Sequence, residues 1–117
     1  MHTFVHVEIP TTDLKKAMSF YGPLFNWRFE QFYGDDYMMI FTGDGVQVGG
    51  LTKIKEVPLL EHHYSYVEVP DVAATMARAE SLGGTVIRPL TELPGGLGAY
   101  SVIQCPDGHR IGVWSKR

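Results

Sequence analysis

Disulfides, membrane spans and nucleic-acid-binding patches are what this sequence lacks. Its 117 residues include one cysteine, Cys105, which excludes an intrachain disulfide. No apolar run approaches the roughly 20 residues of a membrane-spanning helix, and the first expected strand begins too early to leave room for a signal peptide. The formal net charge is −3 and Lys and Arg are scattered, so no positive stripe tracks phosphates. We expect a single domain over residues 1–117, cytoplasmic by default, that binds neither nucleic acid nor membrane.

The second half of the sequence repeats a pattern found in the first half. Residues 6–10 (HVEIP) end an alternating apolar run, and residues 66–70 (YVEVP) do the same about half a chain later. Asp13 follows the first run and Asp71 the second, and each aspartate precedes apolar residues at helical spacing. Repetition at this length indicates two copies of one supersecondary unit, and such pairs usually have a cleft between them.

Each copy is predicted to contain a strand, a helix and three further strands. The first copy covers residues 1–56, the linker 57–61 and the second copy 62–117. The helices begin after Asp13 and Asp71 and are expected to end at Gly22-Pro23 and Gly83-Gly84. The fold class is therefore α+β, two β-α-β-β-β units whose curved sheets form an open, U-shaped barrel. The expected strands are 3–9, 27–33, 37–42 and 46–53 in the first copy, and 64–69, 85–88, 100–104 and 110–115 in the second.

The strand faces that point away from the expected helices carry many polar side chains. Because side chains alternate along a strand, His6 and Glu8 share that face in the first copy. The polar groups on these faces are two carboxylates, one imidazole and two phenols, from Glu8, Glu68, His6, Tyr64 and Tyr66. Such groups are costly to bury without partners, so a ligand cleft explains their positions at a lower free-energy cost than a closed core. Aromatic rings on the same faces are suited to stacking on a planar ligand. The candidate ligand-binding residues are His6, Glu8, Tyr64, Tyr66, Glu68, Tyr100 and Trp114.

These candidates also have structural interpretations. His6 can serve as a histidine hydrogen-bonded to a tyrosine or a carboxylate, with no part in chemistry. The carboxylates can pair with Arg88 or Arg110, and the aromatic rings can pack in a core. If the chain is an enzyme, Glu8 is the candidate base and His6 the candidate acid or metal ligand. The sequence alone leaves these alternatives open.

Three segments of the chain resemble the vicinal oxygen chelate superfamily, the group of glyoxalases, bleomycin-resistance proteins and extradiol dioxygenases. Residues 6–21 resemble its opening strand and helix, with Asp13-Leu14 at the helix start and Phe20-Tyr21 near its end. Residues 67–84 resemble its second strand and helix, and residues 104–111 (QCPDGHRI) its terminal hairpin. The segments occur in order over nearly the whole chain. The resemblance implies the two-unit fold, and it implies a homodimer because many members dimerise.

The resemblance also implies where a divalent metal ion would bind. Enzymes of the family take ligands from a His on the first strand, a Glu on the fourth, a His or Gln on the fifth and a Glu on the eighth. His6 matches the first position. The others fall near residues 47–49, which include no carboxylate, on Tyr64, and on Gly112, which has no side chain. We therefore expect no metal ion at the family position and no cofactor.

Three functions are compatible with these residues. The first is metal-independent binding of a small planar or aromatic molecule in the cleft, as in the family's antibiotic-sequestering members. The second is a glyoxalase-like lyase or isomerase with a non-standard divalent metal site built from His6, Glu8 and Glu68. The third is an interaction domain with a vestigial cleft. Whether the chain catalyses any reaction is left open.

Overall fold

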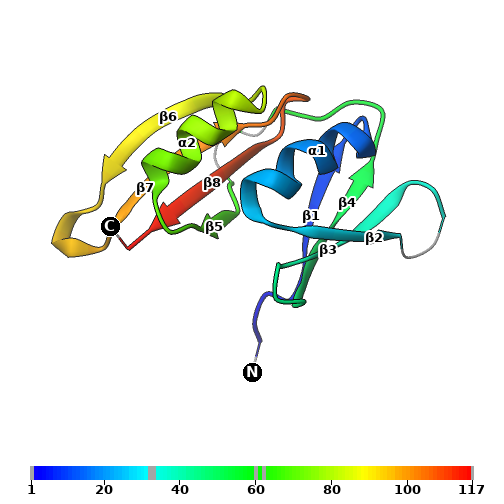
Figure 1. Cartoon of the computed structure of the whole chain (residues 1–117), viewed down its shortest axis with the longest axis horizontal. Helices are drawn as coiled ribbons and strands as arrows, with labels where there is room; N and C mark the ends of the chain where they lie inside the picture. Colours follow the sequence, from blue (N-terminus) through cyan, green and yellow to red (C-terminus); the bar gives the residue numbers. More distant parts are fainter. Residues whose placement is uncertain (1, 32–33, 60, 62, 117) are drawn as a thin grey trace. The chain divides into compact units, whose positions relative to one another are not determined.

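The chain forms two units, each with a four-stranded sheet and one helix (Figure 1). The computed structural model describes residues 2–31, 34–59, 61 and 63–116. Phe32 and Tyr33 of the expected second strand, and Leu60 and His62 in or beside the expected linker, lie outside the described residues. The first unit is Met1–Val57 and the second Pro58–Arg117. The α+β class and the repeated β-α-β-β-β order are confirmed.

In the first unit, one side of the sheet is covered by the helix. The buried helical residues Ala17, Phe20 and Tyr21 form a core with Ile9, Ile40 and Leu51 of the strands. The strand order is β1-β4-β3-β2, with β1 parallel to β4 and the other neighbours antiparallel. The elements are β1 (Val7–Thr11), α1 (Leu14–Phe25), β2 (Arg28–Gln31), β3 (Tyr37–Phe41) and β4 (Gln47–Lys53).

The expected end of the first helix at Gly22-Pro23 is wrong, because α1 continues through Pro23 to Phe25. Packing of aromatic rings accounts for the extra turn. The Phe25 ring centroid lies 4.8 Å from that of Trp27 and 6.3 Å from that of Tyr21. Asn26 then ends the helix in the left-handed conformation, with φ of 56°. These contacts offset the backbone hydrogen bond that a proline cannot donate.

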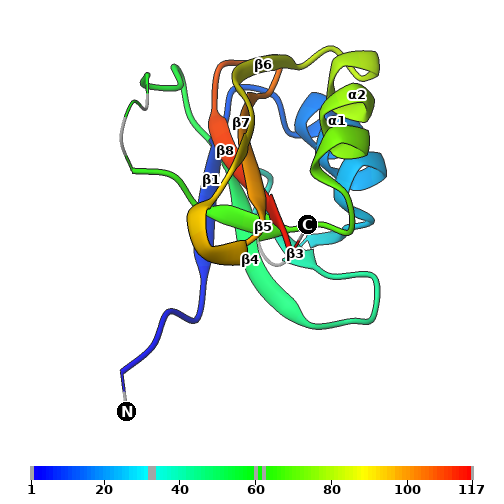
Figure 2. The same ribbon diagram turned by 90° about the vertical axis from the view of Figure 1, so that its left-hand side faces the viewer.

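The second unit has the same plan. Helix α2 covers one side of the sheet (Figure 2). The helix buries Val72, Thr75 and Ala79, and the buried side chains of the sheet include Ile103 and Val113. The strand order is β5-β8-β7-β6, with β5 parallel to β8. The elements are β5 (Tyr66–Glu68), α2 (Val72–Ser81), β6 (Thr85–Glu92), the 3-10 turn η1 (Pro94–Gly96), β7 (Ala99–Gln104) and β8 (Arg110–Ser115).

Three strands differ from their expected limits in ways that affect the site. Strand β1 begins after His6, and β5 begins after Tyr64, so both side chains precede their strands. Strand β6 extends through Pro89 to Glu92, although 89–98 was expected to be a loop. Pro89 cannot donate a hydrogen bond to a neighbouring strand. The sheet tolerates it because β6 is an edge strand and its register with β7 shifts at this point. Neither helix within the described residues has the length and apolarity needed to cross a membrane.

Removing the cap of α1 is expected to weaken the fold. The Asp13 carboxylate accepts the Lys16 backbone N–H at 3.1 Å. Asp13→Ala should lower the free energy of unfolding by about 1 kcal/mol, measured by urea denaturation. Asp13→Asn keeps an acceptor and should cost only a few tenths of that amount. Equal losses in the two variants would contradict a capping role.

The stability of the fold is expected to fall in mild acid because of His109. Burial lowers the pKa of His109 below its ordinary value of 6.5, and Asp107 opposes this only in part. The folded state therefore favours the neutral imidazole, so stability is present above pH 6.5 and is lost as pH falls below it. His109→Gln should flatten this part of the curve of unfolding free energy against pH. Parallel curves for the two proteins would rule out His109 as the cause.

Candidate functional site

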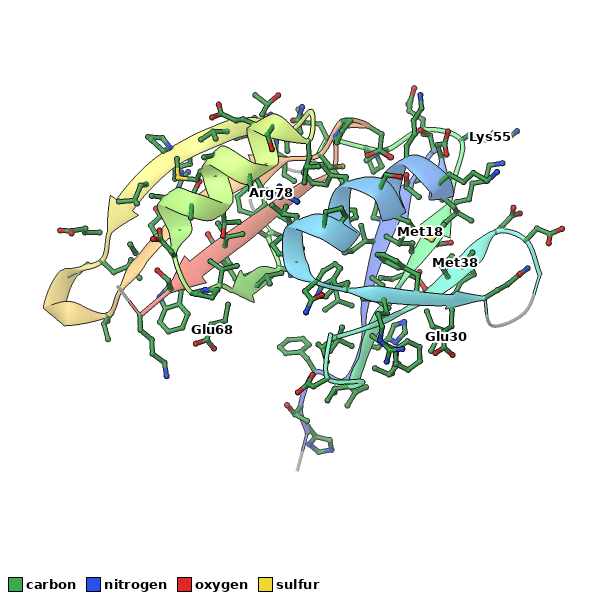
Figure 3. The ribbon with its side chains drawn as sticks, viewed as in Figure 1. Met18, Glu30, Met38, Lys55, Glu68 and Arg78 are labelled. Atoms are coloured by element: carbon green, nitrogen blue, oxygen red, sulfur yellow. The ribbon has the colours of Figure 1, made fainter. Side chains whose placement is uncertain are left out.

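The side of the second sheet that faces away from α2 carries a cluster of aromatic rings. Because side chains alternate along β8, Gly112 and Trp114 turn to the side opposite the buried Ile111, Val113 and Ser115. Gly112 is itself buried, beneath the Tyr66 ring. Glu68 of β5 also projects on the side away from α2 (Figure 3). We call the surface formed by Tyr66, Tyr100, Gly112 and Trp114 the aromatic face.

The ring of Tyr66 lies directly against the backbone of Gly112. The two residues are partners in the parallel β5–β8 register. A Cβ atom added to Gly112 would collide with the Tyr66 ring, including Cζ at 2.7 Å. The absence of a side chain at 112 therefore makes room for the Tyr66 ring, which remains 50% exposed on its outer side.

Burial raises the pKa of the Tyr66 phenol above its ordinary value of 10.0, and Tyr100 adds to this while Arg88 opposes it. The phenol is accordingly neutral near pH 7, and a neutral phenol is a poor metal ligand. Tyr66 thus contributes a ring surface and a hydroxyl group rather than an anionic donor.

Tyr100 joins Tyr66 to a positively charged side chain. The two ring centroids are 6.1 Å apart with planes inclined at 66°, an edge-to-face contact. Arg88 Nη1 donates a hydrogen bond to the Tyr100 hydroxyl at 3.1 Å, and its guanidinium carbon lies 5.9 Å from the ring centroid. The sequence suggested Arg88 only as an ion-pair partner for a glutamate. The residue lay within the expected strand 85–88, but the register shifts between β6 and β7 on either side of it were not foreseen.

Trp114 is held in place by the chain that precedes β7. Its indole Nε1 donates to the Leu97 carbonyl at 2.9 Å. Gly98, at φ of 96°, packs so closely that a Cβ atom there would meet the Ser115 carbonyl and lie 3.0 Å from the indole nitrogen. The glycine-rich segment is therefore attached to β8, and it fixes the orientation of the Trp114 ring.

The two other candidates in the second unit lie at different positions. The Tyr64 hydroxyl donates to the Glu61 carbonyl at 2.6 Å, in the segment before β5. Glu68 lines a pocket of about 510 Å³ near the start of α2. Among the residues the structure describes, Glu68 forms no ion pair with Arg88 or Arg110. Arg110 instead donates a hydrogen bond from its Nε to Gln104 at 2.9 Å. The other lining residues of the pocket are Val69, Pro70, Asp71, Val72, Leu90, Glu92, Ala99 and Lys116.

In the first unit, His6 takes part in a hydrogen-bond chain. Its Nε2 lies 2.7 Å from the Tyr37 hydroxyl, and its Nδ1 lies 3.0 Å from Gln47 Nε2. Gln47 Nε2 also donates to the Gly49 carbonyl at 3.1 Å, which orients the amide. Nδ1 is therefore an acceptor, and the ring hydrogen lies on Nε2 and is donated to Tyr37. Glu8, two residues after His6, is exposed and is the partner of Gly50 in the β1–β4 register.

The described residues do not fit the metal ion that the family resemblance implies. Within them, no three His, Cys, Asp or Glu side chains gather in a group able to hold an ion. Both ring nitrogens of His6 have protein partners, and the Tyr66 ring lies against Gly112, where the family places a carboxylate. A metal ion would need a rearrangement at both positions.

Introducing a side chain at position 112 tests the contact between Gly112 and Tyr66. Gly112→Ala should lower the free energy of unfolding by about 1–3 kcal/mol, because the new methyl group displaces the ring. In a Tyr66→Ala background the same change should cost almost nothing. A double-mutant cycle by chemical denaturation measures the coupling, and an equal cost in both backgrounds would refute the packing described here.

A family model and a known protein that match this sequence both carry a glyoxalase-type name. The family model for the Glyoxalase/Bleomycin resistance protein/Dioxygenase superfamily matches residues 3–113. A "Glyoxylase-like domain-containing protein" from Didymella fabae is 29% identical over 94 residues, covering 74% of this chain and 73% of that protein.

Solved structures that are similar in fold include the following two. A glyoxalase/bleomycin resistance protein/dioxygenase family enzyme from Burkholderia phytofirmans PsJN has a TM-score of 0.78 and 15% identity, covering 99% of this chain and 100% of its own. The E126Q mutant of the fosfomycin resistance protein FosX from Listeria monocytogenes, complexed with Mn(II) and 1S,2S-dihydroxypropylphosphonic acid, has a TM-score of 0.79 and 16% identity, covering 97% and 90%. Because the family model spans nearly the whole sequence, this chain belongs to the glyoxalase/bleomycin resistance protein/dioxygenase superfamily.

Proposed function

We propose that this chain binds a small planar or aromatic molecule on the aromatic face, without a metal ion. The contact between Tyr66 and Gly112 is the observation that carries the proposal. It puts a half-exposed ring where the enzymes of the family place a carboxylate ligand. An exposed aromatic ring binds planar molecules by stacking and by burying apolar area.

The fixed orientation of the neighbouring rings supports the same function. Trp114 is held by Leu97, and Tyr100 by Arg88 and by its edge contact with Tyr66. A rigid set of rings loses little conformational entropy when a ligand binds, which favours affinity. The wider set of candidates (His6, Glu8, Tyr64 and Glu68), the homodimer and the cytoplasmic location remain predictions that accompany this proposal.

A glyoxalase-like lyase or isomerase with a non-standard metal site is the second candidate. The FosX mutant that shares this fold was crystallised with Mn(II), which is the observation that favours it. In such an enzyme Glu8 would act as the base and His6 as a ligand or acid. Mass-spectrometric metal analysis of the purified chain separates the two functions, because a stoichiometric metal ion would support the enzyme and contradict our proposal.

Binding is expected to persist in EDTA and to depend on Tyr66. A panel of planar aromatic compounds, including 2-naphthamide, should contain members that raise Tm in EDTA. A ligand at about 100 times its Kd stabilises the folded state by about 2.7 kcal/mol. Tyr66→Ala should abolish the rise, whereas Phe4→Leu, which removes a ring that is 97% exposed in the other unit, should retain it. A panel without effect, or a rise that disappears in EDTA, would contradict the proposal.

A further inference from the structure

We infer that the ligand of the aromatic face is an aromatic carboxylic acid, whose ring stacks on Tyr66 and whose carboxylate binds Arg88 and the Tyr100 hydroxyl. This inference rests on the proposed function and narrows it to one chemical class. It follows from the hydrogen-bonding capacity and the position of a single arginine.

Arg88 has donor capacity that the described residues do not use. A guanidinium group carries five N–H donors, and within the described part of the chain only Tyr100 is seen to accept one from this side chain. Arg88 is exposed, and no described carboxylate forms an ion pair with it. The charge therefore remains available to an anion, and the planar guanidinium matches the two oxygens of a carboxylate.

Tyr100 supplies a second donor at the same point. Its hydroxyl oxygen accepts from Arg88 Nη1 at 3.1 Å, which leaves its own O–H to donate to another group. Two donors, one of them cationic, thus lie side by side on the helix-free side of the sheet. A carboxylate satisfies both, whereas a neutral amide offers one oxygen acceptor and no charge.

The Tyr66 ring is close enough to Arg88 and the Tyr100 hydroxyl for one small ligand to contact all three groups. The Tyr66 ring centroid is 6.1 Å from that of Tyr100, and the Arg88 guanidinium carbon is 5.9 Å from the same centroid. Tyr100 therefore contacts both an exposed ring and a cation. A carboxylate attached directly to a planar ring system has dimensions that suit this arrangement.

Glu68 and Glu92, both of which the structure describes, do not form an ion pair with Arg88. Glu68 and Glu92 line the pocket near the start of α2, together with Lys116. These two glutamates would attract a cationic ligand, whereas Arg88 would attract an anionic one. The charge of the preferred ligand therefore tells whether the glutamates or Arg88 direct binding.

Three naphthalene probes of matched size test the inference: 2-naphthoate, 2-naphthamide and 2-naphthylmethylammonium. Calorimetric titration in EDTA at low salt should give an affinity for the naphthoate about fivefold higher than for the naphthamide, the range of an exposed charge-assisted pair. Arg88→Gln should remove this preference, because it weakens naphthoate binding more than naphthamide binding. Arg78→Gln removes the same charge from the exposed surface of α2 and should keep the preference. Tyr100→Phe should weaken naphthoate binding only, and circular dichroism confirms that each variant is folded.

The outcomes distinguish this inference from the function on which it rests. Equal affinities for the naphthoate and the naphthamide, a preference that survives Arg88→Gln, or tighter binding of the ammonium probe would overturn the aromatic-acid assignment, while aromatic binding itself stands. No binding of any of the three, together with no active compound in the wider panel, would overturn the proposed function and this inference with it.

Discussion

The contact between a tyrosine ring and a glycine backbone determines the chemistry of the second unit. Gly112 lies on β8, an inner strand, and its missing Cβ lets the Tyr66 ring lie against the sheet. The ring lies at the position where the family resemblance implies a carboxylate ligand, and its outer side is exposed. It also sets the edge-to-face contact with Tyr100, which in turn positions the bond to Arg88. The aromatic face therefore depends on one residue having no side chain.

The first unit uses the same physical device with different residues. Gly50 lies on the inner strand β4, and a Cβ atom there would collide with the Tyr37 side chain. The Tyr37 hydroxyl in turn bonds to His6 at 2.7 Å. In both units a glycine on an inner strand makes room for a tyrosine, whose hydroxyl or ring contacts another polar or aromatic side chain. Close approach to a backbone is a common reason for glycine inside a strand.

Much of the fold could be predicted from the sequence, because its signals are local. Asp13 and Asp71 both cap helices as expected, and the alternation along β8 places Gly112 and Trp114 opposite the buried residues. The misplaced end of α1 comes from the packing of Phe25 on Trp27 across the helix cap, a local contact that the Gly22-Pro23 stop signal outweighed in the prediction.

The site was less predictable, because its contacts join residues that are far apart in the sequence. The pairing of Arg88 with Tyr100 depends on register shifts between β6 and β7 that no local pattern encodes. The bond from Gln47 to His6 joins residues far apart in the sequence. Sequence reasoning proposed Tyr66, Tyr100 and Trp114 as candidates but did not predict the hydrogen bonds that orient two of these rings.

NMR of the chain with isotope-labelled tyrosine rings tests the central claim most directly. Titration with 2-naphthamide in EDTA should shift the ring signals of Tyr66 and Tyr100 through the ring current of the bound molecule, and leave those of Tyr37 in place. Shifts that spare Tyr66, or that occur only after Mn(II) is added, would contradict binding on the aromatic face without a metal ion.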